Sequence, residues 1–258
     1  MAPLKFAICS ALAVFGAGLA GLALQRIVPE KHLTGAPRDM VGAVVGLLAL
    51  LSALVLGLLI WTAYGVYSAQ NQAIQTLAGK VLQFDLALSD YGPEAGKLRA
   101  ELKDTLAKTI DEVWHPSRRE TDAEFATENF KGAVRNLHAR EPLQEALHPT
   151  TDQEKQALTA ATADMDAIGQ TRMQMSFALA SPVSYPLIIM VVAWATFLFF
   201  GYGLMSKANV VSVTAVLIGA LAVASATLLV LDLSNPYSGL FRVSSAPLKQ
   251  VLAVLGTE

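Results

Sequence analysis

The chain has 258 residues, of which 53% are hydrophobic and 16% are charged, and its formal net charge is −2. Charged residues make up about a quarter of an ordinary soluble domain, so this composition argues against one and indicates an integral membrane protein. Nearly all the charge falls between Lys80 and Arg172, where acidic residues outnumber basic ones, which argues against a nucleic-acid partner. The one cysteine, Cys9, excludes a disulfide within the chain.

Long apolar segments predict the membrane-spanning helices. Each of four segments without Asp, Glu, Lys or Arg can hold about twenty helical residues, enough to cross the hydrocarbon core. We therefore predict an all-α integral membrane protein with a soluble helical-bundle domain inserted between the second and third transmembrane helices. The predicted transmembrane helices are 4–24, 40–68, 183–205 and 210–231, the helical domain is 69–181, and an amphipathic C-terminal tail is 232–258. The first segment is too long for an ordinary signal-peptide core, which favours a retained helix over a cleaved one.

Small residues in the first two spans indicate close helix packing. Gly16, Gly18 and Gly21 give the first span a face that a neighbouring helix can approach closely. Gly42 and Gly46 form a GxxxG pair in the second span. For this pair, helix packing and the ordinary abundance of glycine in membrane helices are equally good explanations.

The second span is predicted to continue out of the membrane as a stalk over 70–91. Its apolar residues recur at alternating spacings of three and four, which is the pattern of a coiled-coil seam. The helix is predicted to end at Gly92, and Pro93 to begin the next helix at its first position. The seam residues are Ile74, Leu77, Val81, Phe84, Leu88 and Tyr91.

Three more helices complete the predicted helical domain. The first carries a single stripe of leucines and other aliphatic residues. The second begins at a capping box, Thr121-Asp-Ala-Glu124, and the third begins at another, Thr151-Asp-Gln-Glu154. The third is the second stalk, over 152–180, and its predicted seam is Leu158, Met165, Ile168, Arg172, Met175 and Leu179. The predicted core face of the second helix is Phe130, Val134 and Leu137.

A strong turn signal, Asn235-Pro-Tyr-Ser-Gly239, follows the fourth span. Apolar residues then recur through the amphipathic tail, which is predicted to lie at the membrane interface or to pack on the stalks. Asp232 ends the fourth span, where it caps the helix, pairs with Arg242 or is solvated.

No catalytic or cofactor-binding pattern is recognisable in the sequence. The histidines are scattered and never at metal-ligand spacing, and no phosphate loop, GxSxG motif or Cys/His arrangement occurs. We therefore expect no enzyme, no metal and no cofactor. The spans contain no Asp, Glu, Lys or Arg at mid-membrane depth, which argues against proton pumps and voltage sensors.

Arg172 is the candidate residue for binding an anion. It occupies a seam position one or two turns before the membrane, where its guanidinium can bind an anion or a lipid headgroup phosphate. The alternative, which the sequence favours, is an arginine that extends toward the membrane interface and pairs with a carboxylate on a stalk.

Several stretches carry a resemblance to one family. They include Ala53-Leu-Val-Leu-Gly-Leu-Leu59, Asp232-Leu-Ser-Asn-Pro-Tyr-Ser-Gly239 and Arg242-Val-Ser-Ser-Ala-Pro-Leu248. On these residues the chain, from about Val41 onward, resembles a widespread family of bacterial membrane proteins described as bestrophin-like. In that family an acid is usual where Ser234 stands. The matching motif residues are Asp232, Pro236, Tyr237, Gly239, Arg242, Ser244 and Pro247.

The resemblance implies kinship with bestrophins, which are pentameric anion channels with cytosolic helical domains. An oligomeric anion channel is therefore the first hypothesis, with the second span of each copy lining the pore. Ordinary helix packing is the alternative explanation of the same helix face. The pore-lining candidates are Leu51, Leu54, Leu58 and Trp61 as a hydrophobic gate, and Thr62, Tyr64 and Tyr67 as its polar mouth.

The second hypothesis is a non-conducting membrane scaffold or sensor whose helical domain binds a protein partner. The absence of charge in the spans favours it, whereas stalks continuous with two spans favour coupling across the membrane. Lysines and arginines near the span ends slightly favour an orientation with the helical domain and both termini in the cytoplasm. The resemblance implies that the membrane is a bacterial inner membrane. The expected partners are the lipid bilayer, further copies of the chain in a homo-oligomer, and an anion.

Overall fold

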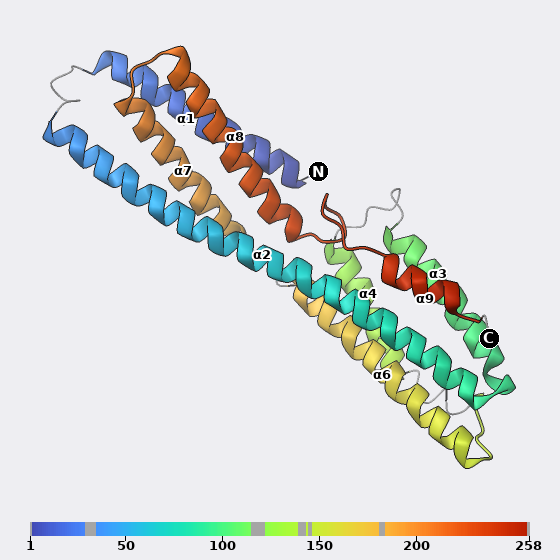
Figure 1. Cartoon of the computed structure of the whole chain (residues 1–258). Coiled ribbons are helices and arrows are strands. Elements are labelled where there is room, and N and C mark those ends of the chain that lie inside the picture. Colours follow the sequence, from blue (N-terminus) through green and yellow to red (C-terminus); the bar gives the residue numbers. More distant parts are fainter. Residues whose placement is uncertain are drawn as a thin grey trace. The chain divides into compact units, whose positions relative to one another are not determined.

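The structure, a computed structural model, describes residues 2–28, 35–114, 122–138, 143, 146–180 and 184–256. These residues form helices joined by turns, without a strand among them, which confirms the all-α prediction. The chain divides into two compact units, which are described separately below (Figure 1). The first unit is Met1–Tyr64 with Val183–Ser234, and the second is Gly65–Pro182 with Asn235–Glu258.

The first unit contains the four helices that are long and apolar enough to cross a membrane. This finding confirms four candidate spans in the described part of the chain, and the second helix continues into the stalk as the sequence predicts. That helix begins at Ala36 and runs without a break to Tyr91, so its later residues belong to the second unit. The four helices are α1 (Ala2–Ile27), α2 (Ala36–Tyr91), α7 (Tyr185–Met205) and α8 (Val210–Leu233).

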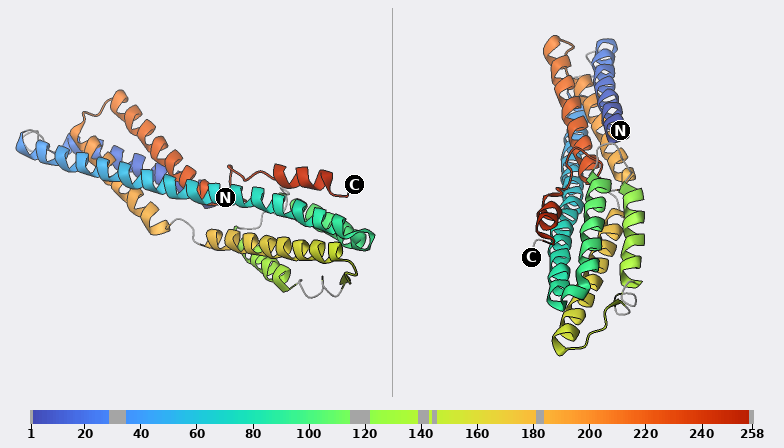
Figure 2. Two further views of the ribbon diagram at one scale, coloured as in Figure 1. Left: turned by 60° about the horizontal axis from the view of Figure 1, so that its bottom comes forward. Right: turned by 90° about the vertical axis from the view of Figure 1, so that its right-hand side faces the viewer.

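Glycine contacts bring α1 close to α7 and α8 (Figures 1 and 2). A Cβ on Gly21 would overlap the backbone of α7, and a Cβ on Gly203 of α7 would overlap the backbone of α1. A Cβ on Gly18 would overlap the Val216 side chain of α8, whereas Gly16 faces open space. Two of the three predicted glycines therefore serve close packing, as small residues do between membrane helices.

The GxxxG pair of α2 behaves differently. A Cβ on Gly42 would meet only the end of the Met205 side chain, and Gly46 has nothing within 4 Å. Within one copy of the chain, this pair is therefore no close-packing surface.

In the described part of the second unit there are five helical elements besides the end of α2. As predicted, α2 ends before Gly92, whose φ of 114° is a conformation that favours glycine. Pro93 then begins a short 3₁₀ turn that leads directly into α3. The elements are η2 (Pro93–Ala95), α3 (Gly96–Trp114), α4 (Asp122–His138), α6 (Asp152–Ala180) and α9 (Ala246–Val254).

The predicted seams form the core of this second unit. Along α2 the seam residues Ile74, Val81, Phe84, Leu88 and Tyr91 are buried, and Leu77 is partly buried beside them. On α6 the seam buries Leu158, Ile168 and Met175 in the same cluster. The C-terminal segment adds Val243, Leu248, Val251 and Leu255. Of the two predicted positions for the tail, the described residues thus show packing against the helical domain.

The buried face of α4 is not the predicted one. Phe130 is exposed and lies 5.7 Å, between ring centroids, from the exposed Phe177 of α6. The buried residues of α4 instead include Ala126, Asn129 and Ala133, and Asn129 is hydrogen-bonded to α6. Small residues on this face let α4 lie close along α6 (Figure 2). The large side chain of Phe130 therefore does not mark the buried face of α4.

The two predicted capping boxes have different outcomes. At the start of α6, the Glu154 N–H donates to Thr151 Oγ1 (3.2 Å) and the Thr151 N–H donates to Glu154 Oε2 (3.1 Å). This is the reciprocal capping box that the sequence predicts. The box at Thr121 and the side chain of Leu137 lie outside the described residues.

Candidate functional site

One face of α2 is exposed along the whole membrane-spanning part of the helix. Only 11% of its most apolar window is buried, against 28–33% for the other three candidate spans. Residues on the opposite side of the helix, Val45, Leu59 and Ala63, are buried. We call the exposed face the α2 strip. Its large apolar side chains are Met40, Val44, Leu47, Leu50, Leu51, Leu54, Leu58, Trp61 and Tyr64.

Six of the seven predicted pore residues lie in the exposed, first-unit part of α2. Leu58 is 57% exposed and Trp61 is 75% exposed, so neither holds one copy of the unit together. Thr62 is also exposed, and its Oγ1 donates to the carbonyl of Leu59 (3.0 Å). Tyr67 differs, because it belongs to the second unit and is partly buried against the core there.

The predicted family-motif residues are divided between the two units. In the first unit Asp232 is 4% exposed in the last turn of α8. The neighbouring Ser234 is buried, and its Oγ donates to the carbonyl of Val230 (2.7 Å). An ionised carboxylate at this position would have no proton to donate, so it could not make this hydrogen bond.

In the second unit, Tyr237 joins the C-terminal segment to α2. Its hydroxyl donates to Gln70 Oε1 (2.9 Å), and Gln70 Nε2 donates to the carbonyl of Met175 in α6 (2.9 Å). Gln70 is completely buried. The Tyr237 ring lies 4.2 Å from the Phe125 ring and meets the Trp114 ring edge-on at 6.1 Å, between centroids. Through the buried Gln70 amide, Tyr237 therefore connects the C-terminal segment to two helices, α2 and α6.

The remaining motif residues shape the turn that places α9. The Gly239 N–H donates to Asn235 (3.0 Å), and Arg242 Nε donates back to the Gly239 carbonyl (3.2 Å). The carbonyl of Pro236 accepts from the Val243 N–H (3.0 Å), and Trp114 Nε1 donates to the Val243 carbonyl (2.7 Å). Two motif residues start α9: Ser244 Oγ accepts from the Ala246 N–H (3.1 Å), and Pro247 lies in the first turn.

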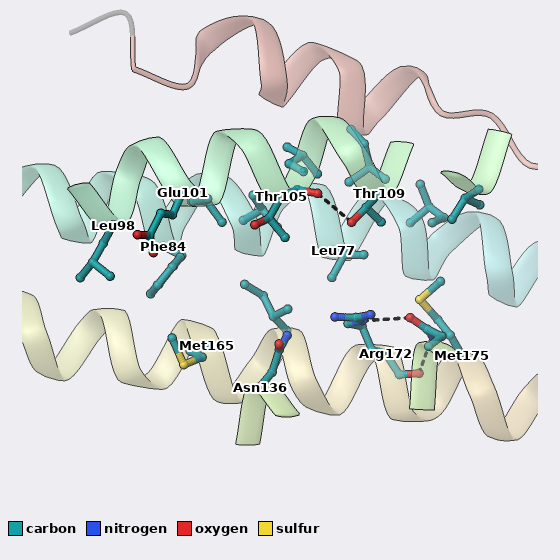
Figure 3. Close-up of a pocket in the computed structure, with 18 of the residues that line it drawn as sticks. Leu77, Phe84, Leu98, Glu101, Thr105, Thr109, Asn136, Met165, Arg172 and Met175 are labelled. Carbon is teal, nitrogen blue, oxygen red and sulfur yellow. Dashed lines mark hydrogen bonds between the residues drawn. The ribbon is translucent and has the colours of Figure 1, made fainter. Parts of the chain in front are cut away.

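A cavity of about 400 Å³ lies inside the second unit (Figure 3). Most of its walls are aliphatic, aromatic or methionine side chains from α2, α3, α4, α6 and α9. Its polar lining residues are Glu101, Thr105 and Thr109 of α3, Asn129 and Asn136 of α4, and Arg172 of α6. Glu101 and Thr105 are solvent-exposed, so the cavity opens along α3. The helix that was predicted as the second stalk thus contributes one cation to an otherwise apolar space.

Asn129 holds the side chain of Arg172. Arg172 Nε donates to Asn129 Oδ1 (2.9 Å), while Asn129 Nδ2 donates to the Arg172 carbonyl (2.9 Å) and to Ser176 Oγ (3.2 Å). The guanidinium lies directly against Gly132, where a Cβ would overlap its Cζ and both Nη atoms. Among the described residues, the partner of Arg172 is thus an amide and not a stalk carboxylate.

The electrostatic surroundings of Arg172 are unfavourable to its charge. Burial lowers the pKa of the guanidinium from its ordinary value, and the positive charge of nearby Arg135 lowers it further. An arginine remains charged even so, because its ordinary pKa lies far above neutral pH. The cavity therefore holds a cation that an anion would stabilise.

Three of these residues were assigned no role from the sequence. Gln70 lies four residues before Ile74, the first seam residue, and so on the same face of the helix. A polar residue on a seam face could have indicated this role. Asn129 lies between Ala126 and Ala133 at helical spacing. This face of small residues could have indicated close packing around Asn129. The role of Gly132 could not be predicted from neighbouring residues, because it depends on Arg172, forty residues away.

A family model described as a bestrophin-like domain matches residues 12–248 of the chain. The matched range begins within α1 and ends within α9, so it contains both the α2 strip and the cavity. Searches of curated proteins and of solved structures each found no match to the chain.

Proposed function

This chain belongs to the bestrophin-like family, and we propose that it forms an oligomeric membrane channel for anions in which the α2 strip of each copy lines the pore. Its four long apolar helices are those of a membrane protein. The proposal adds assembly, conduction and ion preference to these findings.

The exposed α2 strip is the observation that carries the proposal. A pore-lining face has to be free in the single copy, since its neighbours across the pore are other copies. The strip meets this requirement over about twenty-five residues, which is the length of a membrane span. A face that served only to hold the unit together would instead be buried, as Val45 and Ala63 are on the other side of α2.

The packing of the other spans supports a pore between copies. At Gly21 and Gly203 the backbones of α1 and α7 are too close for even a methyl group between them. A small core of Val14, Ala195 and Ala220 fills the space between α1, α7 and α8. An aqueous path is therefore better accommodated between several copies than between these helices.

The chemistry of the strip suits a hydrophobic gate. Leu51, Leu54 and Leu58 present only aliphatic surface, and such a constriction closes by losing its water. Thr62 and Tyr64 follow toward the end of the unit and add hydroxyl groups, which make this end of the exposed face more polar than its leucine part. No Asp or Glu occurs from Met40 to Gly79 to attract cations. In orientation, the proposal keeps the helical domain and both termini in the bacterial cytoplasm.

Leu58→Ala tests the pore assignment. The shorter side chain widens the proposed gate, so chloride efflux from liposomes containing purified protein should rise. Leu221→Ala on α8 is the matched control, since Leu221 is also 57% exposed and loses the same atoms. Both exposed substitutions should leave the unfolding free energy within about 0.5 kcal/mol of wild type. Equal chloride efflux from the two variants in a conducting protein would contradict the assignment.

A further inference from the structure

The guanidinium of Arg172 is held in place before any ligand arrives. Its Nε is engaged by Asn129, whose own amide is fixed by two further hydrogen bonds to α6. The flat group rests on the backbone of α4 at Gly132. Neither Nη atom donates a hydrogen bond to any residue that the structure describes. Two amino groups thus remain for a ligand, on a side chain whose rotamer freedom has already been lost.

Within the described residues, the charge of Arg172 is not compensated by a carboxylate. No carboxylate of the described residues forms an ion pair with it, and the positive charge of Arg135 acts on it unfavourably. Such partly buried charges are normally paired. An anion bound to the Nη atoms would supply the missing partner without breaking a contact to Asn129.

The rest of the cavity is shaped for an apolar body. Its volume of about 400 Å³ falls in the range of about 300–1,000 Å³ that is typical of small-molecule sites. In Figure 3, Arg172 lies toward the end with Leu77 and Met175, whereas Glu101 lies toward the end with Leu98 and Phe84. Arg172 and Glu101 therefore favour one orientation of a bound ligand, with its anionic head beside Arg172 and its apolar chain extending along α3.

We propose that this cavity is a binding site for a single-chain aliphatic acid, whose anionic head pairs with the Nη groups of Arg172 and whose chain lies among the apolar side chains of α2, α3 and α6. The site belongs entirely to the second unit, so it does not depend on the proposed conduction.

A chain-length series measures the apolar part of the site. Hexanoate, octanoate and decanoate are titrated calorimetrically into the full-length protein in nanodiscs, with empty nanodiscs as the reference for partition into lipid. Each added CH₂ that enters the cavity should tighten binding about fourfold. Decanol, which lacks the charge, should bind at least about tenfold more weakly than decanoate, because it cannot form the charge-assisted hydrogen bonds.

Two variants separate the charge from its position. Arg172→Gln should weaken decanoate binding at least about tenfold, whereas Lys97→Gln, which removes the same charge from an exposed side chain of α3, should not. Gly132→Ala keeps Arg172 but places a methyl group where the guanidinium lies, so it should also weaken binding. Alanine favours a helix more than glycine does, so this loss should come without a lower melting temperature. Gly79→Ala, which meets nothing within 4 Å on α2, is its control.

The proposal is overturned by any of three results. The first is no decanoate binding by wild type beyond that of empty nanodiscs. The second is equal decanoate affinity in wild type, Arg172→Gln and Gly132→Ala. The third is an affinity for acetate or inorganic phosphate equal to that for decanoate, which would show that the apolar walls contribute nothing.

Discussion

Replacing Tyr237 by phenylalanine removes one hydroxyl group from the centre of the second unit. That hydroxyl donates to Oε1 of Gln70, which is completely buried and cannot turn to water for a substitute. The ring itself stays, so its contacts with Trp114 and Phe125 are kept. The substitution therefore removes the hydrogen bond that joins the C-terminal segment to α2.

The expected loss follows from leaving a buried acceptor without this donor, which costs about 1–3 kcal/mol. At about 2–4 °C per kcal/mol, a loss of about 1.5 kcal/mol lowers Tm by about 3–6 °C. Combining Tyr237→Phe with Gln70→Leu removes both polar partners, which leaves no orphaned group from this pair. The double variant should therefore lose about 1 kcal/mol less unfolding free energy than the two single variants lose together.

Thermal unfolding of the full-length protein in one detergent, followed by circular dichroism, measures all four states of this cycle. Tyr185→Phe is the control, because Tyr185 is 50% exposed on α7 and loses the same atom. If Tyr237→Phe has the same Tm as wild type, or if the losses of the two single variants simply add in the double variant, the Tyr237–Gln70 bond does not hold the C-terminal segment to α2.

Three further predictions concern stability. Arg99 binds both carboxylate oxygens of the buried Asp85 at 2.9 Å, so Asp85→Ala should lower the unfolding free energy by about 3–5 kcal/mol in denaturant titrations. Gly21→Ala should destabilise the protein by about 1–3 kcal/mol in the same titrations, whereas Gly16→Ala, with open space beside it, should not. Backbone hydrogen bonds lower the pKa of Glu154, so the cap that its carboxylate forms fully stabilises α6 above pH 4.5, its ordinary pKa. This stabilisation is lost as the pH falls through the lower pKa that Glu154 has in the folded protein. Between about pH 6 and pH 3, the Tm of Glu154→Gln should therefore fall less than that of wild type.

Local patterns explain what the sequence predicts correctly. The seam from Ile74 to Tyr91 is readable because helical spacing alone decides which side chains share a face. The end of α2 is readable because Gly92 and Pro93 each suit one backbone conformation. The capping box at Thr151 needs residues only three apart. Each of these features depends on neighbours in the chain, so no knowledge of the tertiary structure is required.

Contacts between distant segments explain what the sequence leaves open. Arg172 meets Asn129 across forty-three residues, and Tyr237 meets Gln70 across one hundred and sixty-seven. Any of several carboxylates on the stalks was an equally good partner for Arg172 in the sequence. Only the packing of α4 against α6 brings an amide to it. The cavity depends on the same packing, so it has no sequence signature of its own.

Residue size also misleads where helices lie close together. On α4 the bulky Phe130 suggests a core face, yet the helix packs through Ala126 and Ala133. Gly18 and Gly21 on α1 make close contacts, whereas the GxxxG motif of α2 does not. Spacing of small residues therefore indicates where two helices can approach, and the shape of the neighbouring helix decides whether they do.

The most direct test of the channel proposal is ion flux from liposomes containing the purified protein, with chloride compared with potassium and the subunit number measured by light scattering on the same sample. The proposal predicts chloride-selective flux from an assembly of several copies. A monomer or dimer that passes neither ion would contradict it, and would favour a membrane scaffold whose helical domain binds a partner.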